Sequence, residues 1–224
     1  MTELLPCVEV EPREPARASV IFLHGLGADG HDFEPVVPIL QTTGVRFVFP
    51  HAPALPVMIN NGYSMPAWYD VRSLDFDAVD RENPQQVAAS TARVEALIAR
   101  ERARGIPSER IVLGGFSQGA AMAIHAGVRH GEALAGLLVL SGYLVCASVF
   151  ERERSPANLA TPVLQCHGRH DSVVPFKAGR DAHALLQRTA APGTALQWQE
   201  YPIAHEVSPE ELALVGGWLR ARFD

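Results

Sequence analysis

The sequence is poor in cysteine, in aromatic residues and in long hydrophobic runs, and it has no excess of positive charge. Of 224 residues, 3 are cysteine and 7% are aromatic, and 19 Lys and Arg stand against 25 Asp and Glu, for a formal net charge of −6. Proteins that bind nucleic acid need a positive surface, so we expect no nucleic-acid partner. The cysteines, Cys7, Cys146 and Cys166, are too few for a disulfide framework, which favours a cytoplasmic location.

Signals for export and for membrane anchoring are also missing from the sequence. Residues 1–15 are acidic and contain proline, whereas a secretory signal needs a basic start and an apolar centre. No run is apolar for long enough to cross a bilayer, so we expect no stable membrane insertion. Internal repeats, charged tails and linkers are missing too, and the length suits one domain. We therefore predict a single domain over residues 1–224.

The most informative stretch that is present combines a strand, a forced turn and a helix. Residues 111–116 are mostly apolar, and residues 118–128 contain no proline and few β-branched residues, which favours a strand followed by a helix. Ser117 lies between them, flanked by Gly115 and Gly119 in the pattern GxSxG. A Cβ at either glycine would collide where strand and helix cross, and the free N–H groups of the helix start face the space above the serine. The pattern favours Ser117 as a nucleophile over a tight turn without chemistry.

Apolar runs alternate with helix-like segments along the rest of the chain. The predicted strands lie at residues 20–23, 46–49, 111–116, 134–140, 163–166 and 196–201. The predicted helices lie at residues 32–40, 84–105, 118–128 and 177–189 and after Ser208. This alternation predicts an α/β fold with a mostly parallel central sheet and helices on both faces. Ligands of such sheets bind at the carboxyl ends of the strands, so the residues just after each strand are the candidate site residues.

A carboxylate and a histidine follow the later strands in the order that α/β-hydrolases use. Asp171 comes after the second-to-last predicted strand and His205 after the last one, which gives the chain order Ser, Asp, His. Most other histidines lie in helices, after earlier strands or, like His170, beside the proposed acid. Asp171 is preferred to Asp181, which lies in a helix, and to Glu206, which is adjacent to His205 and stays the first alternative. We predict His205 as the general base and Asp171 as the carboxylate that orients it.

A glycine-rich loop, residues 24–30, follows the first predicted strand. Its glycine spacing fits neither the dinucleotide pattern nor the P-loop, and no lysine follows, which argues against a bound nucleotide. A loop at this place can instead lend a backbone N–H group to an oxyanion hole that faces the nucleophile turn. Leu26 is the predicted donor.

Two other functions fit parts of the pattern. His167, His170, Asp171 and His205 could ligate zinc, but a zinc site would leave Ser117 without a role. A non-catalytic binding module with this fold would not need a serine, an acid and a histidine at three strand ends. We therefore expect an enzyme with no metal and no cofactor.

The segment of residues 51–83 is long and irregular, with prolines, glycines and exposed-looking apolar residues. Loops this long inside a compact domain are usually functional, and a packed surface excursion is the alternative. No insertion between predicted strands is large enough for a separate cap domain, so we expect a shallow site that only loops cover. We predict that six apolar residues bind the acyl chain: Leu55, Val57, Met58, Trp68, Leu144 and Val174.

On these motifs the chain resembles the phospholipase/carboxylesterase family of α/β-hydrolases, which includes bacterial carboxylesterases and acyl-protein thioesterases. The resemblance spans nearly the whole chain, in the segments LHGLGADGHDF, FPHAP, PVMINNGYSMPAWYD, GGFSQGAAMA, LSGYL, HGRHDSVVP and YPIAHEV. It implies an α/β-hydrolase fold with Ser117, His205 and Asp171 as the catalytic triad. It also implies that the N–H groups of Leu26 and Gln118 form the oxyanion hole.

The resemblance further implies a reaction and a range of substrates. We expect a serine carboxylesterase that cleaves short-to-medium acyl esters through an acyl-enzyme, with an acyl-protein thioesterase or a lysophospholipase as alternatives. The partner is then a small-molecule ester or acyl-thioester, and a homodimer is implied by the resemblance alone. Pro66, Ala204 and the Arg169-His170 pair depart from the family pattern, and they bear on the substrate rather than on the triad.

Overall fold

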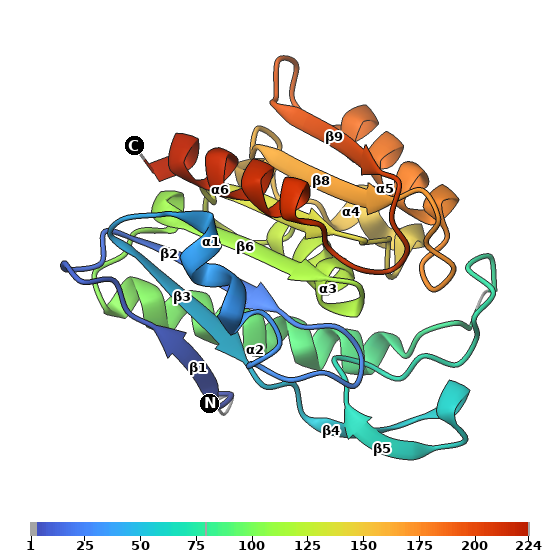
Figure 1. Ribbon diagram of the computed structural model, residues 1–224. Coiled ribbons are helices and arrows are strands. Elements are labelled where there is room, and N and C mark those ends of the chain that lie inside the picture. Colours follow the sequence, from blue (N-terminus) through green and yellow to red (C-terminus); the bar gives the residue numbers. More distant parts are fainter. Residues whose placement is uncertain (1–3, 79, 224) are drawn as a thin grey trace.

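The computed structural model describes residues 4–78 and 80–223, which are arranged around a seven-stranded sheet (Figure 1). In their order across the sheet, the strands are β1 (Cys7–Val10), β3 (Val45–Pro50), β2 (Ala18–Leu23), β6 (Ile111–Phe116), β7 (Gly136–Leu140), β8 (Val163–Gly168) and β9 (Leu196–Tyr201). β1 pairs antiparallel with β3, and the other neighbours pair parallel. The mostly parallel sheet is confirmed, and each predicted strand lies within two residues of its expected ends.

Helices cover both faces of the sheet, as predicted. One face carries α2 (Pro84–Ala103), α3 (Gln118–Gly127), the one-turn α4 (Phe150–Glu153) and α5 (Phe176–Thr189), and the other carries the one-turn α1 (Val37–Leu40) and α6 (Pro209–Phe223) (Figure 1). In the described part of the chain, no helix has both the length and the apolar character needed to cross a membrane.

Two hydrophobic cores separate the sheet from its helices, one on each face. Successive residues of a strand point to opposite sides. Accordingly, Ile21 and Leu23 of β2 join the core under α2 and α3, while Val20 and Phe22 join the core under α6. Because the central strands are buried on both faces, they are continuously apolar, and this is why their positions could be read from the sequence.

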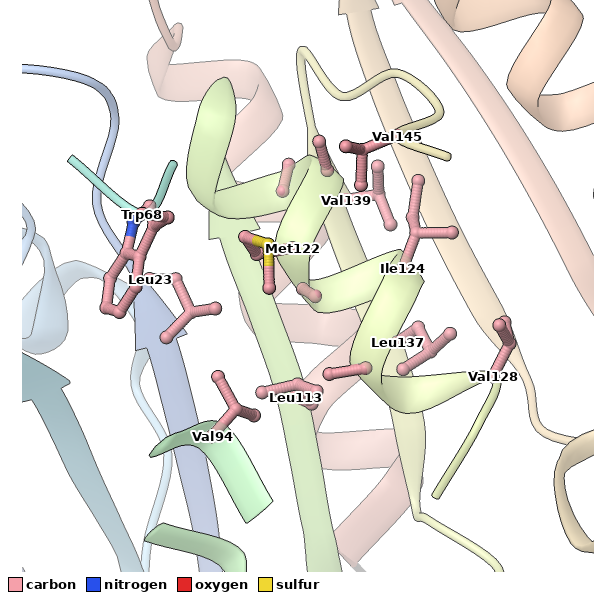
Figure 2. Packing of buried hydrophobic residues seen from close by; sticks show 14 of the residues in the cluster. Leu23, Trp68, Val94, Leu113, Met122, Ile124, Val128, Leu137, Val139 and Val145 are labelled. Atoms are coloured by element: carbon pink, nitrogen blue, oxygen red, sulfur yellow. The ribbon is translucent and has the colours of Figure 1, made fainter. Parts of the chain in front are cut away.

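The helix that starts next to Ser117 lies against the middle of the sheet (Figure 2). All ten residues of α3 are buried, and Met122 and Ile124 pack among Leu113, Leu137 and Val139 from β6 and β7. The helix is rich in alanine and glycine, which lets it approach the strands closely. The turn at Ser117 is therefore fixed at both ends by the packed core.

The N-terminal edge of the sheet differs from the prediction. β1 was not expected, because it is four residues long, half-exposed and interrupted by Glu9. Ion pairs connect this region to α2: Glu9 contacts Arg100 at 3.0 Å and Arg104 at 2.6 Å. The fully buried Glu101 contacts Arg46 of β3 at 2.9 Å.

Two other segments also differ from the prediction. The helix expected over residues 32–40 is reduced to a 3-10 turn, Glu34–Val36, and the single turn of α1, since Pro35 and Pro38 remove backbone N–H donors. The segment of residues 51–83 is more regular than expected. It contains an antiparallel hairpin of β4 (Ala54–Val57) and β5 (Tyr63–Pro66).

Candidate active site

The turn at Ser117 has the strained backbone that the GxSxG pattern predicts. Ser117 has φ 55° and ψ −119°, in a region that residues with a side chain rarely occupy. A Cβ on Gly115 would lie 2.5 Å from the carbonyl carbon of Gly119, and a Cβ on Gly119 would overlap the carbonyl oxygen of Leu23. The Ser117 N–H donates to the Leu140 carbonyl oxygen at 2.9 Å, which ties the turn to β7. Both glycines are therefore required by close backbone approach.

The structure brings Ser117, His205 and Asp171 into one chain of hydrogen bonds. The distance from Ser117 Oγ to His205 Nε2 is 2.9 Å, and the distance from His205 Nδ1 to Asp171 Oδ2 is 2.7 Å. The Ser117 and Asp171 residues are buried, and the His205 side chain is 17% exposed. The three residues follow β6, β8 and β9, so their meeting is a consequence of the parallel sheet.

Asp171 is held in its ionised form by donors on both carboxylate oxygens. Its Oδ1 accepts hydrogen bonds from the N–H groups of Val173 at 2.9 Å and Val174 at 2.8 Å, while Oδ2 faces His205. Burial alone would raise the pKa of this carboxyl, but the hydrogen bonds from His205 and the two N–H groups outweigh burial and lower the pKa below its ordinary value. A charged Asp171 fixes a proton on Nδ1 of His205 and leaves Nε2 free to accept one from Ser117.

Hydrogen bonds join the loops that carry Asp171 and His205. The N–H of Arg169 donates to the Tyr201 carbonyl at 2.7 Å, and the N–H of His170 donates to the Ile203 carbonyl at 3.0 Å. The ring of Phe116 lies 4.7 Å from that of His205. The side chain of His170 is exposed, outside the hydrogen-bond chain.

Sequence reasoning missed a second buried histidine behind the acid. His167 Nε2 donates to the Val174 carbonyl oxygen at 2.9 Å and lies 3.6 Å from Asp171 Oδ2. Burial lowers the pKa of His167, so its ring is neutral and acts as a donor at Nε2. The residue was considered only as a zinc ligand. Among residues 4–78 and 80–223, no group of three or more His, Cys, Asp or Glu side chains is arranged to hold a metal.

The glycine loop predicted to provide an oxyanion donor lies beside Ser117. A Cβ on Gly25 would be 3.5 Å from the Cβ of Ser117, so loop and turn are in contact distance. The N–H of Gly27 donates to the Pro66 carbonyl at 2.8 Å. Leu26, between these two glycines, and Gln118, at the start of α3, therefore belong to segments that meet at Ser117.

The six residues predicted to bind the acyl chain do not come together in one pocket. Val57 and Trp68 have no exposed surface and Val174 is 2% exposed, while Met58 is 57% exposed. Trp68 is part of the core, beside Leu23 (Figure 2). Trp68 and Val57 are thus packing residues in this structure: the hairpin turns Val57 inward, and hydrogen bonds to Gln118 and His24 hold Trp68 in the core. Leu55 is half-buried on β4.

One of the six, Leu144, lines a groove of about 430 Å³ between the loop of residues 74–77 and the start of α5. Its apolar lining includes Leu74, Phe76, Tyr143, Pro175 and Ala178. The lining also includes charged residues, Asp75, Asp77, Lys177 and Asp181, with Lys177 paired to Asp181 at 2.6 Å. Aromatic residues in the loop, such as Phe76, were the available sequence signal for this groove.

Comparison with known proteins identifies the family of the chain. The sequence profile described as phospholipase/carboxylesterase matches residues 6–222. The chain belongs to the phospholipase/carboxylesterase family. Like the family, it is a serine hydrolase of acyl esters with an α/β-hydrolase fold.

Curated relatives and solved structures place the chain within this family. It is 39% identical to acyl-protein thioesterase 1 of Gibberella zeae over 91% of this chain and 89% of the relative. It is 34% identical to acyl-protein thioesterase 1 of Cryptococcus neoformans over 98% of both chains. Among solved structures, Zea mays acyl-protein thioesterase 2 is 31% identical with a TM-score of 0.86, and the match covers 98% of this chain and 99% of that one. Arabidopsis thaliana SOBER1 is also 31% identical with a TM-score of 0.86, over 93% and 100%.

Proposed function

We propose that the protein is a serine carboxylesterase that hydrolyses short-to-medium acyl esters with Ser117 as nucleophile, His205 as general base and Asp171 as its partner. The observation that carries the proposal is the continuous hydrogen-bond chain from Asp171 Oδ2 through His205 to Ser117 Oγ, at 2.7 and 2.9 Å. These distances lie within the range for proton transfer between a nucleophile and its base. The strained, glycine-flanked turn supports the same assignment.

The reaction then proceeds in two steps. Ser117 Oγ attacks the acyl carbon while His205 Nε2 takes the hydroxyl proton, and the protonated His205 gives this proton to the leaving oxygen or sulfur. In the second step a water molecule attacks the acyl-enzyme, His205 accepts a proton from it, and Ser117 is released with that proton. The negative charge of Asp171 stabilises the imidazolium in both steps, and no cofactor takes part.

The oxyanion formed in each step needs two N–H donors. We assign them to Leu26 in the glycine loop and Gln118 at the start of α3. The contact of Gly25 with Ser117 and the position of Gln118 immediately after the nucleophile support this assignment. The loss of one such donor typically raises the barrier by about 2.7 to 4 kcal/mol. Leu26→Pro removes one N–H and is therefore expected to lower kcat by about 10²- to 10³-fold. An unchanged kcat in a folded Leu26→Pro protein would exclude the Leu26 N–H as an oxyanion donor.

The acyl chain is assigned to the groove beside Leu144, because this groove combines apolar lining with a position next to the loop of the acid. Each methylene group that is buried contributes about 0.8 kcal/mol, roughly fourfold in kcat/KM, until the groove is filled. We therefore expect short-to-medium esters to be cleaved well and long triglycerides poorly. We expect no increase of rate at a lipid interface, since loops rather than a cap domain cover the site. A homodimer and a cytoplasmic location stay predictions from the sequence.

A second candidate function is favoured by the relatives. Several of them carry the name acyl-protein thioesterase, so the leaving group of the natural substrate is a thiol in this alternative. A lysophospholipase is the third possibility. Ratios of kcat/KM for an oxygen ester and a thioester with the same acyl chain, and for a lysophospholipid, will rank the three.

The decisive experiment for the mechanism replaces the nucleophile. Ser117→Ala is expected to lower kcat by roughly 10⁶ while the protein still folds, and a fluorophosphonate is expected to label Ser117 in the unchanged protein. Ser148→Ala, on a different part of the surface, is the matched control and should keep full activity. Retained turnover in Ser117→Ala, or labelling at another serine, would rule out the assignment.

A further inference from the structure

The side chain of Gln118 is a buried amide, and the proposed function gives a role only to the backbone N–H of this residue. The residue is 1% exposed, and both polar atoms of its amide are used. Its Nε2 donates to the Tyr69 carbonyl oxygen at 2.8 Å, and its Oε1 accepts from the Trp68 N–H at 2.9 Å. The side chain therefore holds the backbone of two consecutive residues in the segment that follows β5. A buried amide is tolerated only when it is fully hydrogen-bonded, so this arrangement is strict in its geometry.

Trp68, which is bonded to Gln118, is also bonded to the glycine loop. Its indole Nε1 donates to the His24 carbonyl oxygen at 2.9 Å, and its ring lies 5.3 Å from the ring of His24. A second bond joins the same segments, from the Gly27 N–H to the Pro66 carbonyl at 2.8 Å. Hydrogen bonds thus attach the glycine loop to residues 66–68 on both sides of Leu26.

We propose that the Gln118 side chain is a positioning residue that sets the distance between the two halves of the oxyanion hole, with Trp68 as the connecting element. The proposal rests on the proposed function, in which Leu26 and Gln118 donate to the oxyanion. Gln118 gives one N–H from its backbone and fixes the segment that carries the other donor through its side chain. Both donors of the oxyanion hole are therefore positioned by one residue at the start of α3.

The need for such a connection follows from the chemistry. Both donors must lie about 2.7 to 3.1 Å from the position of the oxyanion, and they belong to segments about 90 residues apart in the sequence. Within the glycine loop, His24 Nε2 accepts a hydrogen bond from the Ala52 N–H at 3.0 Å, but the two glycines that flank Leu26 have no side chains to fix it. A displacement of one donor by about 1 Å costs up to 10²-fold in rate, without a comparable effect on substrate binding. The proposal therefore predicts a loss in kcat with little change in KM.

The test uses three variants of the full chain. Gln118→Met keeps the length and the backbone N–H but removes both side-chain hydrogen bonds. Trp68→Phe keeps an aromatic ring in the core but removes the bond to His24. The matched control is Gln165→Met, the same substitution at a residue with 0% exposure whose amide bonds the Gly179 carbonyl at 2.9 Å and His183 Nδ1 at 3.2 Å, remote from the glycine loop.

Gln118→Met and Trp68→Phe are each expected to lower kcat by 10- to 100-fold with KM within about twofold, and to weaken a boronic-acid transition-state analogue by the same factor. The kcat of the double variant is expected to be little lower than that of the less active single variant, because both changes break the same connection. Gln165→Met is expected to lower the melting temperature similarly but to keep kcat within about twofold.

The proposal is overturned if Gln118→Met and Trp68→Phe keep kcat when their melting temperatures fall as far as that of Gln165→Met, or if their effects on kcat multiply. Trp68→Phe provides the answer by itself if Gln118→Met does not fold. Failure of the proposed function is a separate result, because it would appear as activity in Ser117→Ala and not as a change in the positioning variants.

Discussion

The two halves of the active site are held in place by different means. The nucleophile half is the proposed nucleophile turn at Ser117, at the centre of the sheet, and its geometry comes from backbone packing around Gly115 and Gly119. The acid–base half consists of the loops after β8 and β9, at the edge of the sheet, where β9 is half-exposed. There, Asp171 and His205 are placed by hydrogen bonds within the loop after β8 and between it and the loop after β9.

The difference indicates how each half responds to change. Backbone atoms in close contact cannot move apart to make room, so the nucleophile half should lose much of its stability when a side-chain atom is added. Hydrogen bonds and charges depend on single protons, so the acid–base half should respond to isosteric substitutions and to pH. The predictions below test this contrast, beginning with the largest expected effect.

Gly119→Ala is expected to prevent folding or to lower the free energy of unfolding by about 4 kcal/mol or more. The new Cβ would overlap the Leu23 carbonyl oxygen and lie 2.5 Å from that of His24, both of them backbone atoms of β2 and the glycine loop. Gly131→Ala is the control, since a Cβ there meets nothing within 4 Å. Urea unfolding of both variants measures the effect, and a stable Gly119→Ala protein would refute the steric description of this half.

Asp171→Asn is expected to lower kcat by about 10⁴-fold and to change the melting temperature much less. The amide keeps the shape of the carboxylate but can present an N–H to His205 Nδ1, which favours the wrong tautomer. Glu206→Gln is the control, because Glu206 is exposed and is the alternative acid. Initial rates decide between them: if Glu206→Gln lost the activity and Asp171→Asn did not, the acid would have to be reassigned.

Glu211 in the first turn of α6, just after the base, is expected to make stability depend on pH. Burial raises the pKa of this carboxyl from 4.5 to about 7, although the Ser208 N–H partly opposes the shift. The stability that it contributes is complete below pH 4.5 and is lost as the pH rises through 7, by up to about 3 kcal/mol. Urea unfolding between pH 5 and 8 should show this decline in the unchanged protein and a flatter profile in Glu211→Gln; parallel profiles would contradict it.

Substitution of His167 is the test of the acid–base half with the smallest expected effect. His167→Gln can keep an N–H donor to the Val174 carbonyl, and His167→Leu cannot. A buried carbonyl left without a partner costs about 1 to 3 kcal/mol, so we expect the free energy of unfolding of His167→Leu to lie below that of His167→Gln by about this amount. Urea unfolding measures the difference, and equal stabilities of the two variants would mean that the hydrogen bond does not hold the acid loop.

The sequence was sufficient to locate six of the seven strands of the main sheet and the three candidate catalytic residues. Strand-end residues of a parallel sheet share one edge, so Ser117, Asp171 and His205 could be expected to meet, and the structure brings them within hydrogen-bond distance. Their catalytic roles stay predictions. The role of Trp68 was not predictable, because its partners His24 and Gln118 are far apart in sequence and their hydrogen bonds leave no local pattern. The inward direction of Val57 likewise depends on the register of a hairpin that was expected to be irregular.

The ion pairs of the N-terminal strand have a consequence for the integrity of the whole sheet. Glu9 and Glu11 provide two of the three carboxylates that face Arg46, Arg100 and Arg104, and the third is the buried Glu101. Proteolytic removal of residues 1–11 would leave three guanidinium groups around one carboxylate. It would also uncover the N–H and C=O groups of β3 along a sheet edge, and such an edge pairs readily with other chains. β1 therefore covers a sheet edge that would otherwise be open to strand pairing, and its removal is expected to increase self-association, which light scattering would measure.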